Sequence, residues 1–528
     1  MSKAADMAKV SAKGGFHLLW GLVISTVISA VGVIVIARLL GADNLGLYTI
    51  AIVAPTMIAT FRDWGVNTAM VRYTAQYNSE NNISKVRSIF VSGLVFELVF
   101  GLSLSILSVS LSGFLANVAF QRPEIVQLIQ ISSLFILSGA LMNAAGAAFT
   151  GMERLHLNSI MLIVQSLVKT GLTIALVIFG LGTLGATLGF SVAVLCAGIT
   201  GVLLMYALYS SLPKPPNGKL AIGETIKTLL KYGFPLSIGA ILIGFLALFY
   251  NLIMAIFVTD NSAIGNYSVA QNFVVLITLF ATPVATMLFP AFSKLDYRKN
   301  PKDLKNVFQY SVKYAALIVV PVTVLVMSLA EPAINTVLAG YSQAPFYLMV
   351  LSVSYLFSAL GSLSISNLIN SQGDTKYNLK LSILQAVIGF PLGFVLISHF
   401  GIIGLIVSTL IVVFPGLILS LGYIKKRYGV SVDWGSSAKI LISATVTGIL
   451  TYLTVTWLPF ISPIRLAIGV VMFVVVFVLL VIFTQTLTRT DLGNIQTIVE
   501  GLGPLRKPLQ IMMSMIEKLM PKSSQTHN

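Results

Sequence analysis

The sequence contains 528 residues, of which 56% are hydrophobic and 9% charged; its mean hydropathy is +0.93 and its formal net charge is +16. Soluble domains carry roughly a quarter charged residues, so this composition excludes a soluble globular protein. Apolar stretches of about 20 residues recur along the whole chain, which is the length needed to cross a hydrocarbon core. We therefore predict a membrane protein.

The apolar stretches are predicted to be helices, because backbone groups in lipid must pair within their own segment. The first stretch is too long for the core of a cleavable signal peptide and is predicted to be a permanent helix. The single cysteine, Cys196, excludes a disulfide within the chain. In chain order we expect fourteen spans, at residues 14–40, 44–70, 86–114, 125–150, 158–180, 184–210, 226–257, 264–292, 305–330, 344–370, 377–399, 401–424, 437–458 and 462–486.

Lysine and arginine are distributed unequally between the two sides that this topology defines. With a cytoplasmic N-terminus, all 33 of them fall in inner segments except Lys169 in mid-membrane and Arg38, Arg122 and Arg465 in outer segments. Cytoplasmic loops of membrane proteins carry such an excess. We therefore predict a multi-pass protein of the cell (plasma) membrane with both termini in the cytoplasm. The same distribution explains the basic charge without nucleic-acid binding.

The chain contains an internal repeat at an offset of 217 to 219 residues. Three segments return: Gly46-Leu47-Tyr48-Thr49-Ile50-Ala51 as Gly265-Asn266-Tyr267-Ser268-Val269-Ala270, Asp43-Asn44 as Asp260-Asn261, and Gly182 and Gly185 as Gly401 and Gly404. An even number of helices per half makes the repeats parallel, with a substrate site near the midplane between them. The expected division is an N-lobe at 1–210, a cytoplasmic linker at 211–225, a C-lobe at 226–426, two further helices at 427–488 and a cytoplasmic amphipathic tail at 489–528.

Two segments around the second span resemble a known superfamily. They are Gly41-Ala42-Asp43-Asn44-Leu45-Gly46-Leu47-Tyr48 and Asp63-Trp64-Gly65-Val66-Asn67-Thr68-Ala69-Met70-Val71-Arg72-Tyr73. The first is similar to a motif of the multidrug/oligosaccharidyl-lipid/polysaccharide (MOP) exporter superfamily, and the second to a segment of its Wzx-like polysaccharide flippases. Trp64 departs from the usual aliphatic residue or Phe, with little expected consequence.

The resemblance implies an all-α fold with two six-helix lobes arranged as a V, plus two C-terminal helices. It also implies outward transfer of a lipid-linked oligosaccharide on a polyprenyl-(pyro)phosphate carrier, without ATP hydrolysis. No cofactor is expected, and a proton or sodium gradient is the candidate energy source. The expected partners are the lipid-linked oligosaccharide, membrane lipids and other glycan-assembly proteins.

Charges inside the bilayer are costly, so they are the first candidates for the transport site. Lys169, in the middle of the fifth span, is interpreted as a counter-charge for a pyrophosphate or an acidic sugar. The alternative is a structural pair with a carboxylate. The position corresponding to Lys169 in the second repeat is Ile388, which indicates that the scaffold does not require this charge.

Arg62 and Asp63, in the second predicted span, and Glu97, in the third, are further candidates. Adjacent helical residues point about 100° apart, so Arg62 and Asp63 are not expected to share a partner. Glu97 is interpreted as a brace for Arg62 or Lys169, or as a protonatable coupling group, and the sequence does not decide the pairing. For Arg62 the alternative is an anchor at the inner interface.

The second repeat offers neutral polar groups instead. Asn251, Gln271 and Asn272 are candidates for hydrogen bonds to sugar hydroxyls, and hydrogen bonds between helices are the alternative. Gly233-Phe234-Pro235 is a candidate bending element for gating, with an ordinary packing kink as the alternative.

Two other transporters of the same superfamily are alternatives: a cation-coupled multidrug antiporter and a lipid II flippase. The residues 14–40 contain no carboxylate of the kind that many of the drug antiporters carry. A membrane glycosyltransferase or polymerase is disfavoured because the outer loops are short and nearly uncharged and no nucleotide-binding motif is present. We therefore expect a transporter and not an enzyme.

Overall fold

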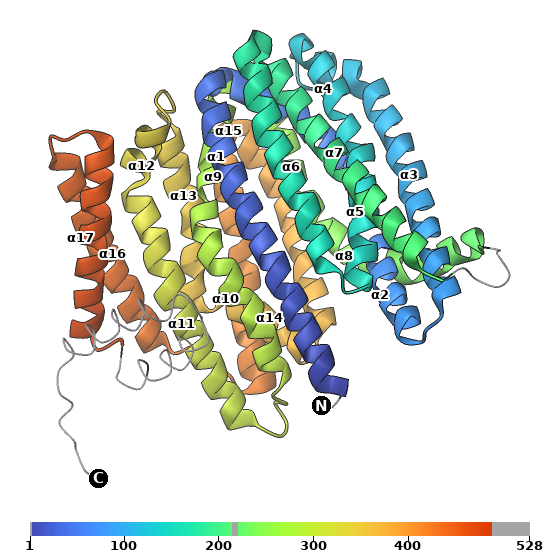
Figure 1. Cartoon of the computed structure of the whole chain (residues 1–528). Coiled ribbons are helices and arrows are strands. Elements are labelled where there is room, and N and C mark those ends of the chain that lie inside the picture. The colour runs from blue at the N-terminus through green and yellow to red at the C-terminus, as the bar shows by residue number, and fades with distance from the viewer. Residues whose placement is uncertain (1–2, 214–219, 488–490, 492–528) are drawn as a thin grey trace. The chain divides into compact units, whose positions relative to one another are not determined.

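The computed structural model describes residues 3–213, 220–487 and 491 of the chain, and every regular element in that part is a helix (Figure 1). The prediction of an all-α polytopic membrane protein is therefore confirmed. The predicted tail at 489–528 lies outside the described residues apart from Asp491, and the linker is described only at its ends.

The helices follow one another with short connections. Their bounds are α1 (Lys3–Ala59), α2 (Val66–Ser79), α3 (Ile83–Phe114), α4 (Val126–Ser132), α5 (Leu134–Gly151), α6 (Leu155–Leu176), α7 (Gly182–Ser211), α8 (Ile222–Phe257), α9 (Asn261–Phe273), α10 (Val275–Ser293), α11 (Pro301–Ser328), α12 (Ala330–Val337), α13 (Ala344–Leu356), α14 (Ser362–Ser371), α15 (Thr375–Tyr428), α16 (Trp434–Trp457) and α17 (Ser462–Phe483). Short helices of other types are η1 (Leu115–Ala119) and η3 (Val177–Leu181), which are π-helical, and η2 (Pro123–Ile125) and η4 (Phe357–Leu360), which are 3₁₀-helical.

The predicted number of spans agrees with these helices. Among the described residues, up to ten segments are long and apolar enough to cross a membrane when the bent pair Ala344–Leu360 and Ser362–Ser371 is taken as one. Three of the ten have the length of two crossings and divide at Gly41, Gly182 and Gly401, which makes thirteen. The helix α8, with an apolar part at Gly244–Phe257, brings the number to fourteen.

Two of these dividing glycines have nearly the same unusual backbone conformation. Gly182 has φ 48° and ψ −128°, and Gly401, its predicted counterpart in the second repeat, has φ 57° and ψ −130°. This region is accessible essentially to glycine alone. The agreement supports the internal repeat, because one rare conformation occurs twice at the predicted spacing.

The helices pack into two units, which are described separately. Unit 1 spans Met1–Asn272, Val337–Gln343 and Leu379–Val412; unit 2 spans Phe273–Thr336, Ala344–Asn378 and Val413–Asn528. These units group segments by packing, and the predicted lobes and linker stay a prediction.

Small residues bring the helices of unit 1 together. A Cβ on Gly101 of α3 would lie 2.7 Å from Ala140 Cβ of α5, and one on Gly198 of α7 would lie 2.7 Å from the Ser138 carbonyl. Close approach of this kind is the usual basis of helix association in membranes. The helix α1 runs beside α6 along much of its length (Figure 1). Unit 1 is therefore held by contact between backbones as much as by large side chains.

Unit 2 combines an aromatic core with a polar junction. The core includes Phe292 of α10 and Phe308 of α11, both fully buried. At the start of α15, Asp374 accepts hydrogen bonds from Tyr428 (2.7 Å) and Tyr423 (2.8 Å), and these bonds hold the pKa of Asp374 below its usual value. Asp374 directly precedes α15 and Tyr428 is its last residue, so the junction holds the two ends of α15 together.

The structure corrects the prediction of one continuous second span at 44–70. The helix α1 ends at Ala59, residues 60–65 form turns, and α2 begins at Val66. The cause is local: Trp64 and Gly65 both have positive φ, 48° and 78°, which ends a right-handed helix. Arg62 and Asp63 therefore lie in a break between helices, and the 100° angle between adjacent helical residues does not describe their directions.

We predict that Gly65→Ala destabilises the protein by about 1–3 kcal/mol, because a side chain at positive φ is strained and because the new Cβ would meet the Gly233 carbonyl. Thermal unfolding of the purified protein in detergent measures this change. Gly113→Ala is the matched control, since nothing lies within 4 Å of that position; it should leave the transition unchanged or raise it. Equal transitions for the two variants would contradict the interpretation.

Candidate functional site

The break at residues 60–65 places two charged side chains beside the first turn of α2. The backbone N–H of Asn67 donates to Asp63 Oδ1 at 2.9 Å. The first N–H groups of a helix have no partner within it, and a carboxylate before the helix supplies one. Asp63 therefore anchors the start of α2 with one oxygen.

Arg62 is buried and forms an ion pair with Glu97 of α3. Its Nε lies 2.9 Å from Glu97 Oε2, and its Nη1 donates to the Ile136 carbonyl of α5 at 3.1 Å. Asn67 Nδ2 donates to the other carboxylate oxygen of Glu97 at 2.6 Å. These contacts decide the pairing that the sequence left open: Glu97 braces Arg62, and the three side chains tie the break to α3 and α5.

A hollow of about 420 Å³ opens next to this network, and we call it the amide hollow. It is formed by the break, α2, α5 and α6. Its lining consists of Asp63, Asn67, Thr68, Val71, Met142, Asn143, Gly146, Ala147, Thr150, Asn158, Met161 and Leu162. Three carboxamides, two hydroxyls and one carboxylate thus line a space in an otherwise apolar part of the chain.

Some of the polar atoms of the amide hollow have no partner. Asn158 Nδ2 donates to Thr150 Oγ1 at 3.0 Å, but among the described residues Asn158 Oδ1 and Asn67 Oδ1 accept no hydrogen bond although both atoms are buried. Buried polar atoms are normally satisfied, so each exception indicates a missing partner. A carboxamide presents both a donor and acceptors, which suits a ligand rich in hydroxyl or amide groups.

No lysine or arginine lines the amide hollow, so it suits a neutral polar group better than a phosphate. Lys169 lies elsewhere on α6, partly buried, with Nζ 5.6 Å from the centre of the Phe190 ring of α7. Within the described residues no carboxylate forms an ion pair with Lys169. The predicted alternative, a structural ion pair, finds no support in this part of the chain.

The neutral candidates of the second repeat lie outside the amide hollow. Gln271 donates to the Tyr267 hydroxyl and Asn272 to the Ser268 carbonyl, both at 2.8 Å and both one turn back on α9. Asn251, on α8, makes no side-chain hydrogen bond within the described residues. The structure thus gathers Arg62, Asp63 and Glu97 and leaves Lys169 and these three residues apart from them.

Sequence reasoning did not select Asn143 and Asn158, and it noted Asn67 only as part of a motif. All three lie within or at the edge of predicted apolar spans, and that was the available signal. Neutral amides in membrane helices commonly form hydrogen bonds with neighbouring helices, so the signal is weak without coordinates.

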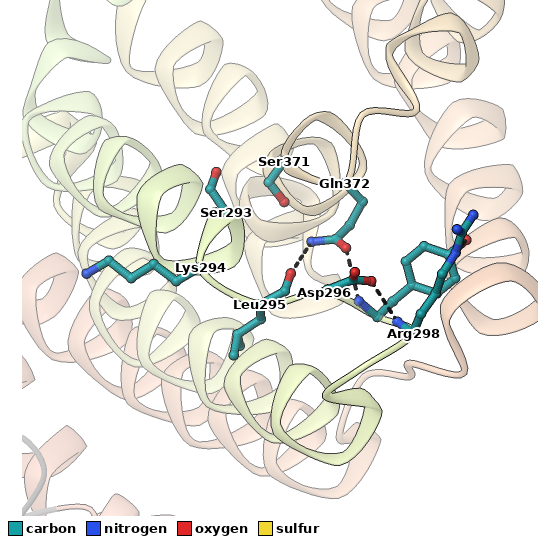
Figure 2. Close-up of a pocket in the computed structure, with 8 residues that line it drawn as sticks. Ser293, Lys294, Leu295, Asp296, Arg298, Ser371 and Gln372 are labelled. Atoms are coloured by element: carbon teal, nitrogen blue, oxygen red, sulfur yellow. Dashed lines mark hydrogen bonds between the residues drawn. The ribbon is translucent and has the colours of Figure 1, made fainter.

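A second hollow, of about 440 Å³, lies in unit 2 between the end of α10 and the end of α14 (Figure 2). Gln372 donates to the Leu295 carbonyl (2.8 Å) and accepts from the Tyr297 backbone N–H (3.2 Å), while Asp296 accepts from the Arg298 backbone N–H (2.9 Å). Lys294 extends away from these groups (Figure 2). The polar atoms here hold a surface loop together, so we assign no substrate to this hollow.

Two family models match the sequence. One, described as polysaccharide biosynthesis protein, covers residues 11–296, and the other, MatE, covers residues 235–395. The fold and the matches together define a multi-pass membrane transporter of the MOP superfamily, as the resemblance predicted. Because the first model covers more than half of the chain, this chain belongs to the polysaccharide biosynthesis protein family.

Three curated relatives illustrate the range of the superfamily. An uncharacterized membrane protein of Methanocaldococcus jannaschii is 22% identical over 72% of this chain and 78% of its own length. The multidrug export protein MepA of Staphylococcus aureus is 27% identical, with 46% of this chain and 55% of that protein covered. The probable low-salt glycan biosynthesis flippase Agl15 of Haloferax volcanii is 22% identical, with 54% and 59% covered. The chain thus spans little more than half of the two relatives that have a named activity.

Solved structures show the same fold at low identity. The lipid II flippase MurJ in an inward closed conformation has a TM-score of 0.71 at 17% identity, covering 89% of this chain and 98% of MurJ. An inward-facing multidrug transporter of the MATE family has a TM-score of 0.59 at 15% identity, covering 78% of this chain and 98% of that protein. At these identities the likeness concerns the fold alone.

We predict that removing one partner of the Arg62–Glu97 pair destabilises the protein more than removing both. Glu97→Ala leaves a buried, unpaired guanidinium and should cost about 3–5 kcal/mol, whereas the apolar double variant Arg62→Met with Glu97→Leu should cost less. Thermal unfolding in detergent compares them. Glu331→Ala, which removes the partly exposed pair with Arg465, is the control and should cost less than about 1 kcal/mol. A double variant less stable than Glu97→Ala would refute this account.

Proposed function

We propose that this protein is a flippase that moves a polyprenyl-(pyro)phosphate-linked oligosaccharide from the inner to the outer leaflet by alternating access, for the synthesis of a cell-surface polysaccharide or glycan. The observation that carries the proposal is the amide hollow: a space of about 420 Å³ lined by Asn67, Asn143 and Asn158, in a chain of the polysaccharide biosynthesis protein family. Three amides around one space, two of them with an oxygen unpartnered within the described part of the chain, favour a polar cargo over hydrogen bonds between helices.

The amide hollow is proposed to hold a saccharide ring of the cargo. Sugar hydroxyls both donate and accept hydrogen bonds. A small rotation of the Asn67 and Asn158 side chains, whose buried oxygens have no partner among the described residues, would present acceptors to them. Asp63 adds a carboxylate oxygen at the rim. The Arg62–Glu97 pair acts indirectly in this proposal, because it fixes the break and α2 in the position that forms the hollow.

Lys169 is proposed to attract the phosphate of the carrier. Its ammonium lies within a span and has no carboxylate partner among the described residues, so an anion entering the protein would lower the cost of keeping it charged. Neutral sugar and charged phosphate are then recognised by different groups of unit 1. Asn251, Gln271 and Asn272 are proposed to contribute hydrogen bonds to sugars further along the path.

Energy for the transfer is proposed to come from a proton or sodium gradient, with Asp63 and Glu97 as the candidate coupling carboxylates. No nucleotide-binding motif is present in the sequence. The proposed location is the plasma membrane with both termini in the cytoplasm, where glycan-assembly enzymes would supply the lipid-linked substrate.

Drug export is the second candidate, since the MatE model and MepA match part of the chain. Transfer of lipid II is a third, because the MurJ fold covers 89% of the chain. A drug exporter would carry cationic dyes without a lipid carrier, and a lipid II flippase would require the peptide of that substrate. Transport of a panel of cationic dyes into proteoliposomes that contain this protein would favour drug export.

The test is leaflet exchange of fluorescent lipid-linked oligosaccharide in proteoliposomes. Asn143→Ala and Asn158→Ala should each slow exchange by about tenfold, the value of one or two lost hydrogen bonds, and should leave exchange of the sugar-free carrier phosphate unchanged. Lys169→Ala should slow both substrates. Asn306→Ala and Lys376→Ala, at exposed positions of the same residue types, are the controls.

Two outcomes would contradict this assignment. Wild-type protein that fails to move the lipid-linked oligosaccharide would overturn the proposed function. If the wild-type protein transports the substrate and all three variants transport it at the same rate, the assigned site is wrong and the proposed function stands.

A further inference from the structure

Arg122 binds the end of a helix that belongs to the other repeat. It lies between η1 and η2 and is 6% exposed. Its Nη1 donates to the Ala255 carbonyl (2.9 Å), its Nη2 to the Val258 (2.6 Å) and Thr259 (3.2 Å) carbonyls, and its Nε to Asn261 Oδ1 (2.7 Å). The last carbonyls of a helix have no partner within it, and α8 ends at Phe257. Arg122 therefore caps α8 and joins it to the start of α9.

Tyr341 makes the corresponding contact in the opposite direction. It lies in the connection after α12, is fully buried, and donates its hydroxyl to the Ala37 carbonyl at 2.6 Å. Ala37 lies in the last turn before α1 breaks at Gly41. A connection from the second repeat thus holds the end of a helix in the first repeat.

The internal repeat relates these two contacts. Tyr341 follows Arg122 by 219 residues, and Ala255 follows Ala37 by 218, within the offset found between the repeated segments. Each connection therefore reaches across to the other repeat and binds the equivalent carbonyl. A crossed pair of this kind is unlike ordinary packing, in which a loop satisfies its own neighbours.

A reciprocal backbone contact lies beside the crossed pair. A Cβ on Gly46 would meet the Asn261 carbonyl, and a Cβ on Gly265 would meet the Ala42 carbonyl. Gly46 and Gly265 are 219 residues apart, as are Ala42 and Asn261. The start of α9 and the part of α1 after Gly41 therefore touch backbone to backbone, with Asn261 also bound by Arg122.

The chemistry of Arg122 suits a contact that opens. Its hydrogen bonds go to neutral oxygens, and among the described residues no carboxylate forms an ion pair with it. Burial lowers the pKa of Arg122, with Glu124 and Asp43 acting in the opposite direction. An arginine bonded only to neutral acceptors regains its hydration when it is exposed, which offsets part of the loss of these hydrogen bonds and leaves no buried counter-charge behind.

We propose that Arg122 and Tyr341, with the carbonyls they bind, form a crossed latch that closes the predicted outer end of the path between the repeats, and that this latch must release for that end to open. Arg122 is the main element because it makes several bonds where Tyr341 makes one. Delivery of cargo through this opening rests on the proposed function. The role of the latch in holding α1 against α9 is independent of the proposed function.

The experiment measures access to the protected contact without any substrate. Leu45, next to Gly46, is 4% exposed, and Cys196 is the single native cysteine. In a Cys196→Ala background, Leu45→Cys is labelled in detergent with a membrane-impermeant maleimide. Labelling should be slow in that background, about threefold to fivefold faster with Tyr341→Phe, at least about tenfold faster with Arg122→Gln, and fastest with both.

Arg465→Gln is the matched control, since Arg465 is another cation of the predicted outer side and belongs to unit 2. It should leave Leu45→Cys labelling unchanged. Tyr341→Phe and Asn261→Ala each remove few atoms. If Arg122→Gln does not fold, faster labelling in these two variants tests the latch in its place. The latch would be overturned if every latch variant were labelled at the rate of the Cys196→Ala, Leu45→Cys background. It would also be overturned if Arg465→Gln accelerated labelling as much as the latch variants do. Wild-type protein that moves no lipid-linked oligosaccharide would overturn the proposed function and leave the labelling result unaffected.

Discussion

Hydrogen bonding of the backbone in lipid is the constraint on which the rest of this structure depends. Hydrocarbon offers no partner to a free N–H or C=O, so a helix can be interrupted at membrane depth only where side chains supply one. The chain interrupts a predicted span at residues 60–65, and α8 ends at a predicted outer connection before α9 begins. At the first break Asp63 accepts from the start of α2, and at the second Arg122 donates to the end of α8. The polar groups with the clearest roles are therefore those that the breaks require.

Arg62, Glu97 and Lys169 show two kinds of charge within unit 1. Arg62 and Glu97 neutralise one another in a buried pair, and Asn67 completes the coordination of the carboxylate. Lys169 has an aromatic ring beside it and no carboxylate among the described residues. No cation is among the residues that line the amide hollow. A neutral ring and a phosphate need different groups, and in the proposed function these side chains would serve the two separately.

The repeat shows what a duplicated scaffold keeps and what it changes. Gly182 and Gly401 retain one rare backbone conformation, because no other residue type adopts it readily. Arg122 and Tyr341 occupy equivalent positions and bind equivalent carbonyls, although their side chains differ entirely. The two repeats keep the backbone conformation that only glycine adopts readily. The side chains that bind the equivalent carbonyls differ, and so does the number of hydrogen bonds they make.

The sequence by itself determined that this is a helical membrane protein and where most of its spans lie. Its apolar runs predicted fourteen spans, and glycines such as Gly182 and Gly401 indicated the repeat, because helix length and backbone conformation depend on neighbours along the chain. It also singled out Arg62, Asp63 and Glu97, since charge in an apolar run is conspicuous. It missed the break at residues 60–65, because the apolar residues before and after this segment were taken as one continuous span.

Only the tertiary structure decided which of these groups meet. Glu97 binds Arg62 across 35 positions of the sequence, and the amide hollow joins Asn67 to Asn158 across 91. Arg122 reaches Ala255 from still farther. Local periodicity indicates which face of a helix is polar, but the partner of that face depends on how distant helices pack, and this information is absent from any single stretch of the chain.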